Sequence, residues 1–176
     1  MKKLILLLVP VFFLSACKTL IPFTDELKTQ NDWKEAELKQ IQFYLSNSIT
    51  LNRQLTNSST AIVSGKIKTI DGKQVEEIVI KKGTPGILTQ QPDNQRMAIS
   101  FEIDDSHYLT FGSYENRGGR YYLMLREFKK DKYAKVSYVE NEYYISPESL
   151  NAFLQINIKK VLKEDRKQRV AGGRKL

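Results

Sequence analysis

Residues 61–80, AIVSGKIKTIDGKQVEEIVI, decide the fold class of this chain. On both sides of Asp71–Gly72, apolar and polar residues alternate with the period of two that is typical of β-strands. Asp-Gly favours a type I′ hairpin turn, because both of its positions tolerate positive φ. The stretch therefore predicts two antiparallel strands joined by a tight turn.

The same period of two continues outward from this hairpin. Residues 97–103, MAISFEI, alternate, and so do residues 120–128 and 133–145 farther along the chain. Thr84–Ile87 predicts a type II turn, with proline and glycine at its centre. About nine short strands at this spacing predict a mainly β fold, an antiparallel meander that forms a sandwich or a small, partly open barrel.

Two short helices interrupt the strand pattern. Asp32 and Glu35 have capping-box spacing, which predicts a helix over residues 32–41. Ser146 followed by Pro147 predicts a short helix before the last strand, because serine caps helices and proline suits the first helical position. Residues 155–161, QINIKKV, then return to alternation and predict the final strand.

The first residues, MKKLILLLVPVFFLSAC, have the order of a bacterial export signal. Lys2 and Lys3 precede an apolar stretch from Leu4 to Leu14, and small residues follow it. The apolar stretch is well short of the roughly 20 residues that a membrane-spanning helix requires. A cleaved leader is therefore predicted rather than a permanent span.

Leu14, Ser15, Ala16 and Cys17 resemble the lipobox of bacterial lipoproteins, and Cys17 is the only cysteine in the chain. The resemblance implies a diacylglyceryl group on the Cys17 sulfur, cleavage by signal peptidase II before it, and acylation of the new amino group. Lys18 stands where lipoproteins retained at the inner membrane typically have aspartate. The resemblance thus implies the outer membrane, with the periplasmic face favoured over the cell surface.

These features divide the chain into four parts. The predicted parts are a signal peptide (1–16), a lipidated tether (17–31), one β-rich domain (32–158) and a basic C-terminal tail (159–176). The mature chain is long enough for a single domain with its own hydrophobic core.

The formal charge of +8 is concentrated in the tail. Residues 159–176 contain eight lysines and arginines against Glu164 and Asp165, whereas residues 17–158 are formally neutral. Anionic headgroups, peptidoglycan carboxylates or an acidic protein patch are the expected partners of such a tail, and a solvated tail without a partner is the alternative. Export to the envelope argues against nucleic acid.

Tyrosines crowd three consecutive predicted strands. Their outward members would form an aromatic surface that anchors a protein or stacks on sugars, while ordinary β propensity is the simpler explanation of their number. The possible partner-binding residues are Tyr121, Tyr122, Tyr133, Tyr138, Tyr143, Tyr144, Lys159, Lys160, Arg166, Lys167 and Arg169.

The sequence predicts neither catalytic nor metal-binding residues, and no cofactor apart from the lipid on Cys17. His107 lies beside Asp104 and Asp105, but neighbours on a strand point to opposite faces, and no nucleophile turn such as GxSxG is present. The adjacent acids Glu76 and Glu77 would likewise point to opposite faces of a strand. A glycan hydrolase would require two acids that converge from separate strands.

The stretches IQFYLSNSITLNR and VEEIVIKKGTPGIL are similar to an uncharacterised group of small Bacteroidetes-type envelope lipoproteins. This resemblance supports the strand meander and implies no activity. The anchor, the tyrosine-rich strands and the basic tail together predict a non-catalytic, lipid-anchored accessory or scaffold protein of an envelope assembly. A peptidoglycan- or glycan-binding module is the main alternative, and a hydrolase is the third possibility.

Overall fold

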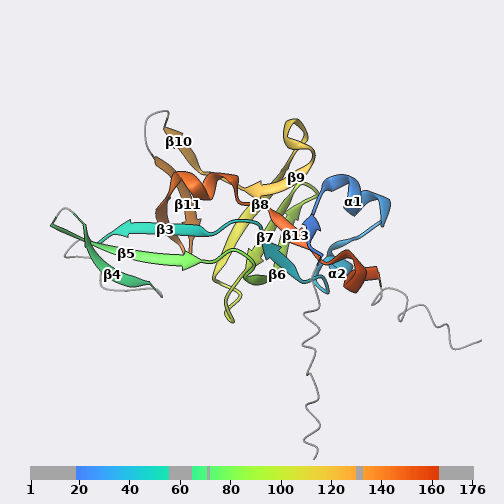
Figure 1. Ribbon diagram of the computed structural model, residues 1–176, viewed down its shortest axis with the longest axis horizontal. Helices are drawn as coiled ribbons and strands as arrows, with labels where there is room; N and C mark the ends of the chain where they lie inside the picture. The colour runs from blue at the N-terminus through green and yellow to red at the C-terminus, as the bar shows by residue number, and fades with distance from the viewer. Residues whose placement is uncertain (1–18, 56–64, 71, 130–132, 163–176) are drawn as a thin grey trace, which may run out of the picture.

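The computed structural model describes residues 19–55, 65–70, 72–129 and 133–162, which form two antiparallel β-sheets and a few short helices (Figure 1). The predicted mainly β fold is confirmed. Among the described helices, none has the length and apolarity required to cross a bilayer.

The first sheet has seven strands in the order β1–β13–β2–β6–β7–β8–β9. Their bounds are Ile21–Pro22 (β1), Leu154–Ile156 (β13), Phe43–Leu45 (β2), Pro85–Asp93 (β6), Arg96–Ser100 (β7), Tyr108–Tyr114 (β8) and Arg120–Leu123 (β9). Strands β6 to β9 form the expected meander, whereas β1, β13 and β2 come together from distant parts of the chain. Isolated bridges from Thr24 to Arg120 and from Tyr122 to Phe153 bring the two edges of this sheet together without a continuous ladder.

The second sheet has six strands in the order β10–β11–β12–β3–β5–β4. Their bounds are Glu127–Lys129 (β10), Tyr133–Tyr138 (β11), Asn141–Ile145 (β12), Ile49–Gln54 (β3), Lys73–Ile80 (β5) and Lys66–Ile70 (β4). The predicted hairpin is the β4–β5 pair, in which Ile70 lies opposite Lys73 and Gly72 has a φ of 73°. In Figure 1 the strands β3, β5 and β4 extend as an arm away from the helices.

Strand β7 shows how closely the layers of the fold pack. Met97 and Ile99 are buried as their alternation predicts, but Ala98 and Ser100 on the opposite face are buried as well. A strand that is covered on both faces cannot be recognised from alternation alone. The predicted inward face also ends early, because the strand stops at Ser100 and Ile103 is fully exposed.

The segment assigned to the tether is largely part of the folded domain. Residues 21–30 form β1 and helix α1 (Asp25–Gln30), and the Thr24 hydroxyl caps this helix by accepting a hydrogen bond from the Leu27 N–H. Phe23 is fully buried, with its ring 5.2 Å from the ring of Phe43 and 5.1 Å from that of Tyr121. Only residues 18–20 lie between Cys17 and β1 in the sequence.

The two predicted helices are present but differ in extent. The first is α2 (Glu35–Leu38), which begins later than predicted because the Glu37 carboxylate accepts a hydrogen bond from the Lys34 N–H, 3.1 Å away. The second is the 3₁₀-helix η2 (Pro147–Asn151). The last strand, β13, is shorter than predicted, because helical structure begins at residue 158, where the Asn157 side chain caps the Lys160 N–H.

The type II turn predicted at Thr84–Ile87 lies three residues earlier. The Thr84 N–H bonds to the Lys81 carbonyl, and Gly83 supplies the positive φ of 77°. Gly86 instead lies in β6 opposite Phe43. A Cβ atom at Gly86 would stand 2.6 Å from the Phe101 ring, so glycine is needed there for close packing.

Candidate functional site

The predicted tyrosine surface does not form as a continuous platform. Tyr121, Tyr122, Tyr138 and Tyr143 are buried, whereas Tyr144 is 40% exposed. The side chain of Tyr133 lies outside the described residues. The prediction was wrong for the four buried rings, because the sequence pattern did not reveal which face of each strand a second layer covers.

Three of the buried tyrosines instead bind carboxylates within the fold. The Tyr121 hydroxyl donates a hydrogen bond to Asp25 (3.0 Å). The Tyr138 hydroxyl donates to Glu102 (2.5 Å), and the Tyr143 hydroxyl donates to Glu76 (3.1 Å). Burial, together with the nearby Glu76 charge, raises the pKa of Tyr143 to about 12. Burial also raises the pKa of Tyr121 and of Tyr138 above the ordinary value. These phenols therefore remain protonated donors under ordinary conditions.

Glu76 lies at the centre of a buried polar cluster that joins three strands. Its carboxylate accepts hydrogen bonds from Arg53 at 2.8 and 3.1 Å and from the Gly65 N–H at 3.3 Å, besides that from Tyr143. The Arg53 guanidinium also donates to Asn141, 2.5 Å away. A buried charge requires such compensation, so the cluster has a structural role.

Glu76 and Glu77 are adjacent in the sequence, and their side chains point to opposite faces of β5. Glu77 forms an ion pair with Lys68 at 2.6 Å on the face opposite to Glu76. The two carboxylates therefore do not share a cleft, as the strand period of two predicts.

His107 closes the loop between β7 and β8. Its Nδ1 atom lies 3.6 Å from an Asp104 carboxylate oxygen and 3.2 Å from the Ser106 hydroxyl, and its ring packs against Tyr138 at 5.7 Å. Asp104 accepts a hydrogen bond from the Ser106 backbone, which lowers the pKa of its carboxyl group. All of these contacts lie within or beside one loop, so they explain its shape without a catalytic role.

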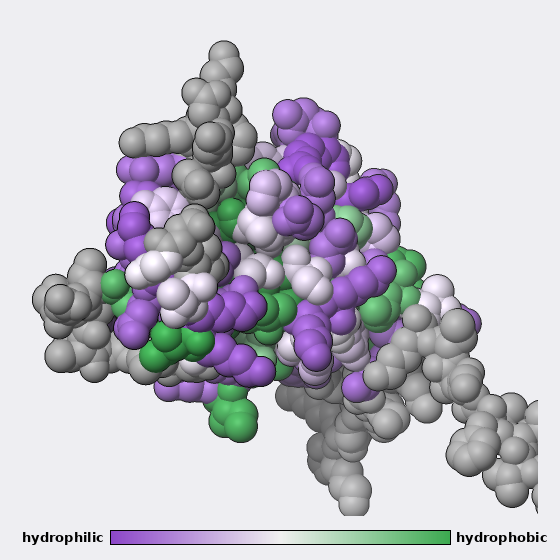
Figure 2. Space-filling model, turned by 60° about the vertical axis from the view of Figure 1, so that its left-hand side comes forward, coloured by the Kyte–Doolittle hydropathy of each residue, from purple (hydrophilic) through white to green (hydrophobic). Residues whose placement is uncertain are grey.

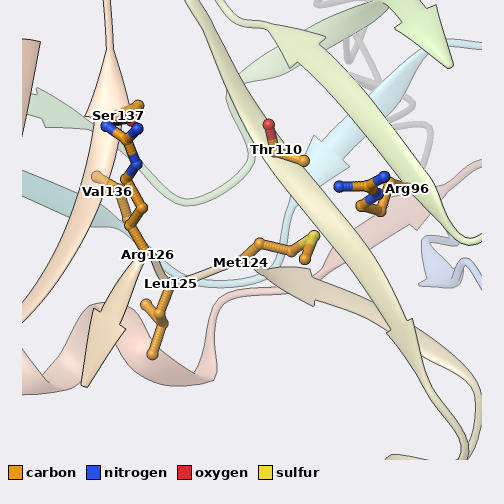
Figure 3. Close-up of a pocket in the computed structure, with 7 residues that line it drawn as sticks. All are labelled: Arg96, Thr110, Met124, Leu125, Arg126, Val136 and Ser137. Carbon is orange, nitrogen blue, oxygen red and sulfur yellow. Dashed lines mark hydrogen bonds between the residues drawn. The ribbon is translucent and has the colours of Figure 1, made fainter. Parts of the chain in front are cut away.

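A cavity of about 170 Å³ opens where β11 meets the β8–β9 side of the first sheet. Figure 3 shows Thr110 and Met124 between Arg96 on one side and Arg126 with Ser137 on the other. Arg96 forms an ion pair with Asp93 at 2.6 Å, and Arg126 lies 3.6 Å from Glu142. Both cations have acidic partners, and the cavity lining contains neither an acid nor a histidine.

A second cavity of about 350 Å³ lies beside the first, and Ser137 lines both. Its remaining lining residues are Ser106, Tyr108, Tyr138, Val139 and Glu140. Glu140 is the single carboxylate in the lining. Neither cavity therefore supplies the two facing acids that glycan hydrolysis requires.

Two exposed side chains on the outer face of the six-stranded sheet are better placed to meet a partner. Val79 lies opposite Thr50 and Tyr144 lies opposite Asn52, so all four side chains share one face, which we call the outer face. Val79 is 47% exposed. Figure 2 turns the arm toward the viewer and shows apolar side chains interspersed among hydrophilic ones. The sequence signal for Val79 was the run Ile-Val-Ile at 78–80, which puts an apolar residue on each face of the strand.

The two ends of the described chain leave the same end of the first sheet. Ile21 of β1 pairs with Ile156 of β13 in antiparallel register. The chain therefore enters β1 and leaves β13 at the same end of the sheet, just before the helical residues that begin at 158. Lys159 and Lys160, two of the predicted tail residues, are exposed just beyond this pair.

The other predicted site residues lie outside the described part of the chain. They are Leu14, Ser15, Ala16 and Cys17 of the lipobox and Arg166, Lys167 and Arg169 of the tail.

Within residues 19–162, apart from the gaps named above, no group of three or more His, Cys, Asp or Glu side chains is arranged to hold a metal ion. A scan against protein-family models and searches of curated proteins and of solved structures found no match to this chain.

Proposed function

We propose that this chain is a non-catalytic, lipid-anchored envelope protein that acts as an accessory or scaffold component at the periplasmic face of the outer membrane. The leader and the lipobox-like residues ending at Cys17 support the anchor. The observation that carries the proposal is the short distance from Cys17 to the folded domain. The four peptide steps from Cys17 to Ile21 span at most about 14 Å, so the anchor holds the domain directly against the bilayer.

The outer face is the proposed partner surface. Val79 and Tyr144 offer partly exposed apolar area on a sheet whose backbone is held by neighbouring strands. Tyrosine is among the residue types that most often anchor protein interfaces. Tyr144 is thus retained from the predicted tyrosine set, while its buried neighbours are not part of the surface. A glycan-binding module has less support, because it requires a broad exposed tyrosine platform and four of the six tyrosines are buried.

The anchor is tested by metabolic labelling with radioactive palmitate. The wild-type chain should incorporate label and lose residues 1–16, whereas Cys17→Ser should do neither. Mass spectrometry of the purified protein checks the cleavage site. An unlabelled wild-type chain that retains its leader would contradict the proposal.

The partner surface is tested by crosslinking in cells followed by co-purification. Val79→Asp should reduce the amount of the captured partner. Ile67→Asp is the matched control, because Ile67 is equally exposed at 47% but lies on the opposite face of the same sheet. Urea unfolding of both variants shows whether each remains folded. Equal capture by both folded variants would remove the outer face from the proposal, and capture by purified peptidoglycan alone would favour the glycan-binding alternative.

A further inference from the structure

We propose that Arg117 and Arg120 bind a phosphate group, either as inorganic phosphate or as a phosphate monoester. The two arginines lie at the start of β9, in and just after the turn that leaves β8. They contact Tyr122, Asn151 and Phe153, and we call these five residues the arginine cluster. This site is independent of the lipid anchor and of the outer face, so it adds a binding activity to the proposed function.

Strand register gathers the side chains of the cluster on one face of the first sheet. Arg120 and Tyr122 are two residues apart in β9, so they point to the same face, while Tyr121 between them points into the core. Phe153 pairs with Tyr122 through an isolated bridge, and the centroids of the two rings are 5.5 Å apart. Tyr114 lies opposite Arg120 in β8 and is 37% exposed, so this face is open to solvent.

Aromatic rings hold both guanidinium groups in place. The Arg117 Cζ atom lies 3.5 Å from the centroid of the Tyr122 ring, and the Arg120 Cζ atom lies 5.2 Å from that of the Phe153 ring. Arg117 folds back over β9 because Gly118, directly after it, has a φ of 69° and reverses the chain. Cations over aromatic faces are attracted by the ring. Both side chains therefore lose part of their freedom before a ligand binds, which favours binding.

Neither arginine of the cluster has an acidic partner. The other described arginines all pair with carboxylates; they are Arg53, Arg96 and Arg126. No carboxylate in the described part of the chain lies within 4.0 Å of the Arg117 or Arg120 guanidinium. Arg117 donates a hydrogen bond to the Asn151 side chain at 3.1 Å. Arg117 is exposed and Arg120 is half-buried, so two positive charges and most of their N–H groups can reach a ligand.

The charge and the donor geometry of the cluster favour phosphate over a carboxylate. A phosphate monoester carries about −1.5 to −2 charges at neutral pH and three strong acceptor oxygens. It can therefore neutralise both guanidinium groups at once. Each guanidinium is a planar fork of N–H donors that matches two phosphate oxygens. A carboxylate has a single charge and would leave one of the two arginines without an anion.

Equilibrium dialysis against radioactive inorganic phosphate tests the site. The full-length chain is purified in a non-ionic detergent, and sodium chloride keeps the ionic strength constant. We expect saturable binding of one phosphate per chain. Arg117→Gln and Arg120→Gln should each weaken binding by about tenfold, because each removes charged donors. Arg117→Lys keeps the charge but loses the planar fork, so it should also bind more weakly than the parent.

Competition identifies the form in which the phosphate is bound. Unlabelled glucose 6-phosphate that displaces the label better than unlabelled inorganic phosphate would indicate a phosphate monoester, and the reverse order would indicate free phosphate. Succinate, a dicarboxylate, should displace the label poorly. Displacement by succinate at the same concentration as by inorganic phosphate would overturn the assignment to phosphate.

Arg126→Gln is the matched control. It removes the same charge from an exposed arginine that already has Glu142 as its acidic partner, so it should bind phosphate like the parent. Undiminished binding by the Arg117 and Arg120 variants, or an equal loss in Arg126→Gln, would overturn the proposal. Urea unfolding shows whether each variant remains folded. If a glutamine variant does not fold, the lysine variant of the same arginine decides the result.

Discussion

Glu76 is a fully buried carboxylate whose stability depends on the donors around it. Removing one partner of a buried ion pair leaves the other charge uncompensated, which costs about 3–5 kcal/mol. We therefore expect Glu76→Gln to lower the free energy of unfolding by about 3 kcal/mol, because the buried ion pair between Arg53 and Glu76 is lost. Urea unfolding measures this difference.

The neighbouring residue provides the control for this substitution. Glu77→Gln removes the same charge from the opposite face of β5, where the ion pair with Lys68 is partly exposed. Exposed ion pairs contribute about 0–1 kcal/mol to the free energy of unfolding. The urea midpoint of Glu77→Gln should therefore lie close to that of the wild type. Equal effects of the two substitutions would show that the buried cluster does not stabilise the fold.

The buried tyrosines predict loss of stability in alkali. The pKa of Tyr143 is about 12 in the folded chain against an ordinary value of 10. Below pH 10 the phenol is protonated in both states and its contribution is complete. Above pH 10 only the unfolded chain loses the proton, so the free energy of unfolding falls by up to about 1.4 kcal/mol per pH unit for each such group, until the folded phenol ionises as well.

Tyr143→Phe removes one of these groups and should make the alkaline decline less steep. Urea midpoints measured between neutral pH and pH 12 check the slope, and the ultraviolet absorbance of tyrosinate reports ionisation. Tyr144→Phe is the control, because the Tyr144 ring is partly exposed. A decline that is equally steep in all three proteins would rule out the Tyr143 contribution.

At the scale of the element, the turn between β11 and β12 is strained. Val139 and Glu140 have φ values of 48° and 60°, although neither is glycine. A left-handed backbone conformation destabilises a non-glycine residue by about 1–2 kcal/mol. Glycine avoids this strain, but it loses more conformational entropy on folding, which costs about 0.5–1 kcal/mol. Glu140→Gly should therefore stabilise the protein by about 0.5–1 kcal/mol while leaving Val139 packed against the core.

Glu142→Gly is the control for the turn, because it makes the same change two residues later within β12. Glu142 accepts a hydrogen bond from Lys135 at 3.2 Å on an extended strand, so glycine there should destabilise the protein. Thermal or urea unfolding compares the two variants. A lower midpoint for Glu140→Gly would show that this turn is not strained in solution.

At the scale of the whole molecule, the first sheet depends on the N-terminal segment. Deleting residues 1–20 should leave the unfolding midpoint nearly unchanged, because the deletion ends before β1. Deleting residues 1–24 removes β1 and the buried Phe23, and loss of a core phenylalanine alone costs about 3–5 kcal/mol. Equal stability of the two truncated chains would show that residues 21–24 are a tether after all.

The sequence alone determined the features that depend on neighbouring residues. The alternation around Asp71–Gly72 predicted the β4–β5 hairpin, and Ser146–Pro147 marked the start of η2. Turn conformations and strand periods are properties of a few consecutive residues, so a single chain reveals them. The mainly β, antiparallel fold followed from these local signals.

Which side chains are covered and which strands meet depends on tertiary packing. Tyr143 and Tyr144 are neighbours in one strand, yet one is buried beside Glu76 and the other is exposed. Likewise, β1 joins the sheet through β13, more than a hundred residues away. Burial and long-range pairing depend on how two curved layers pack, and the free energy of that packing is shared by residues that are distant in sequence.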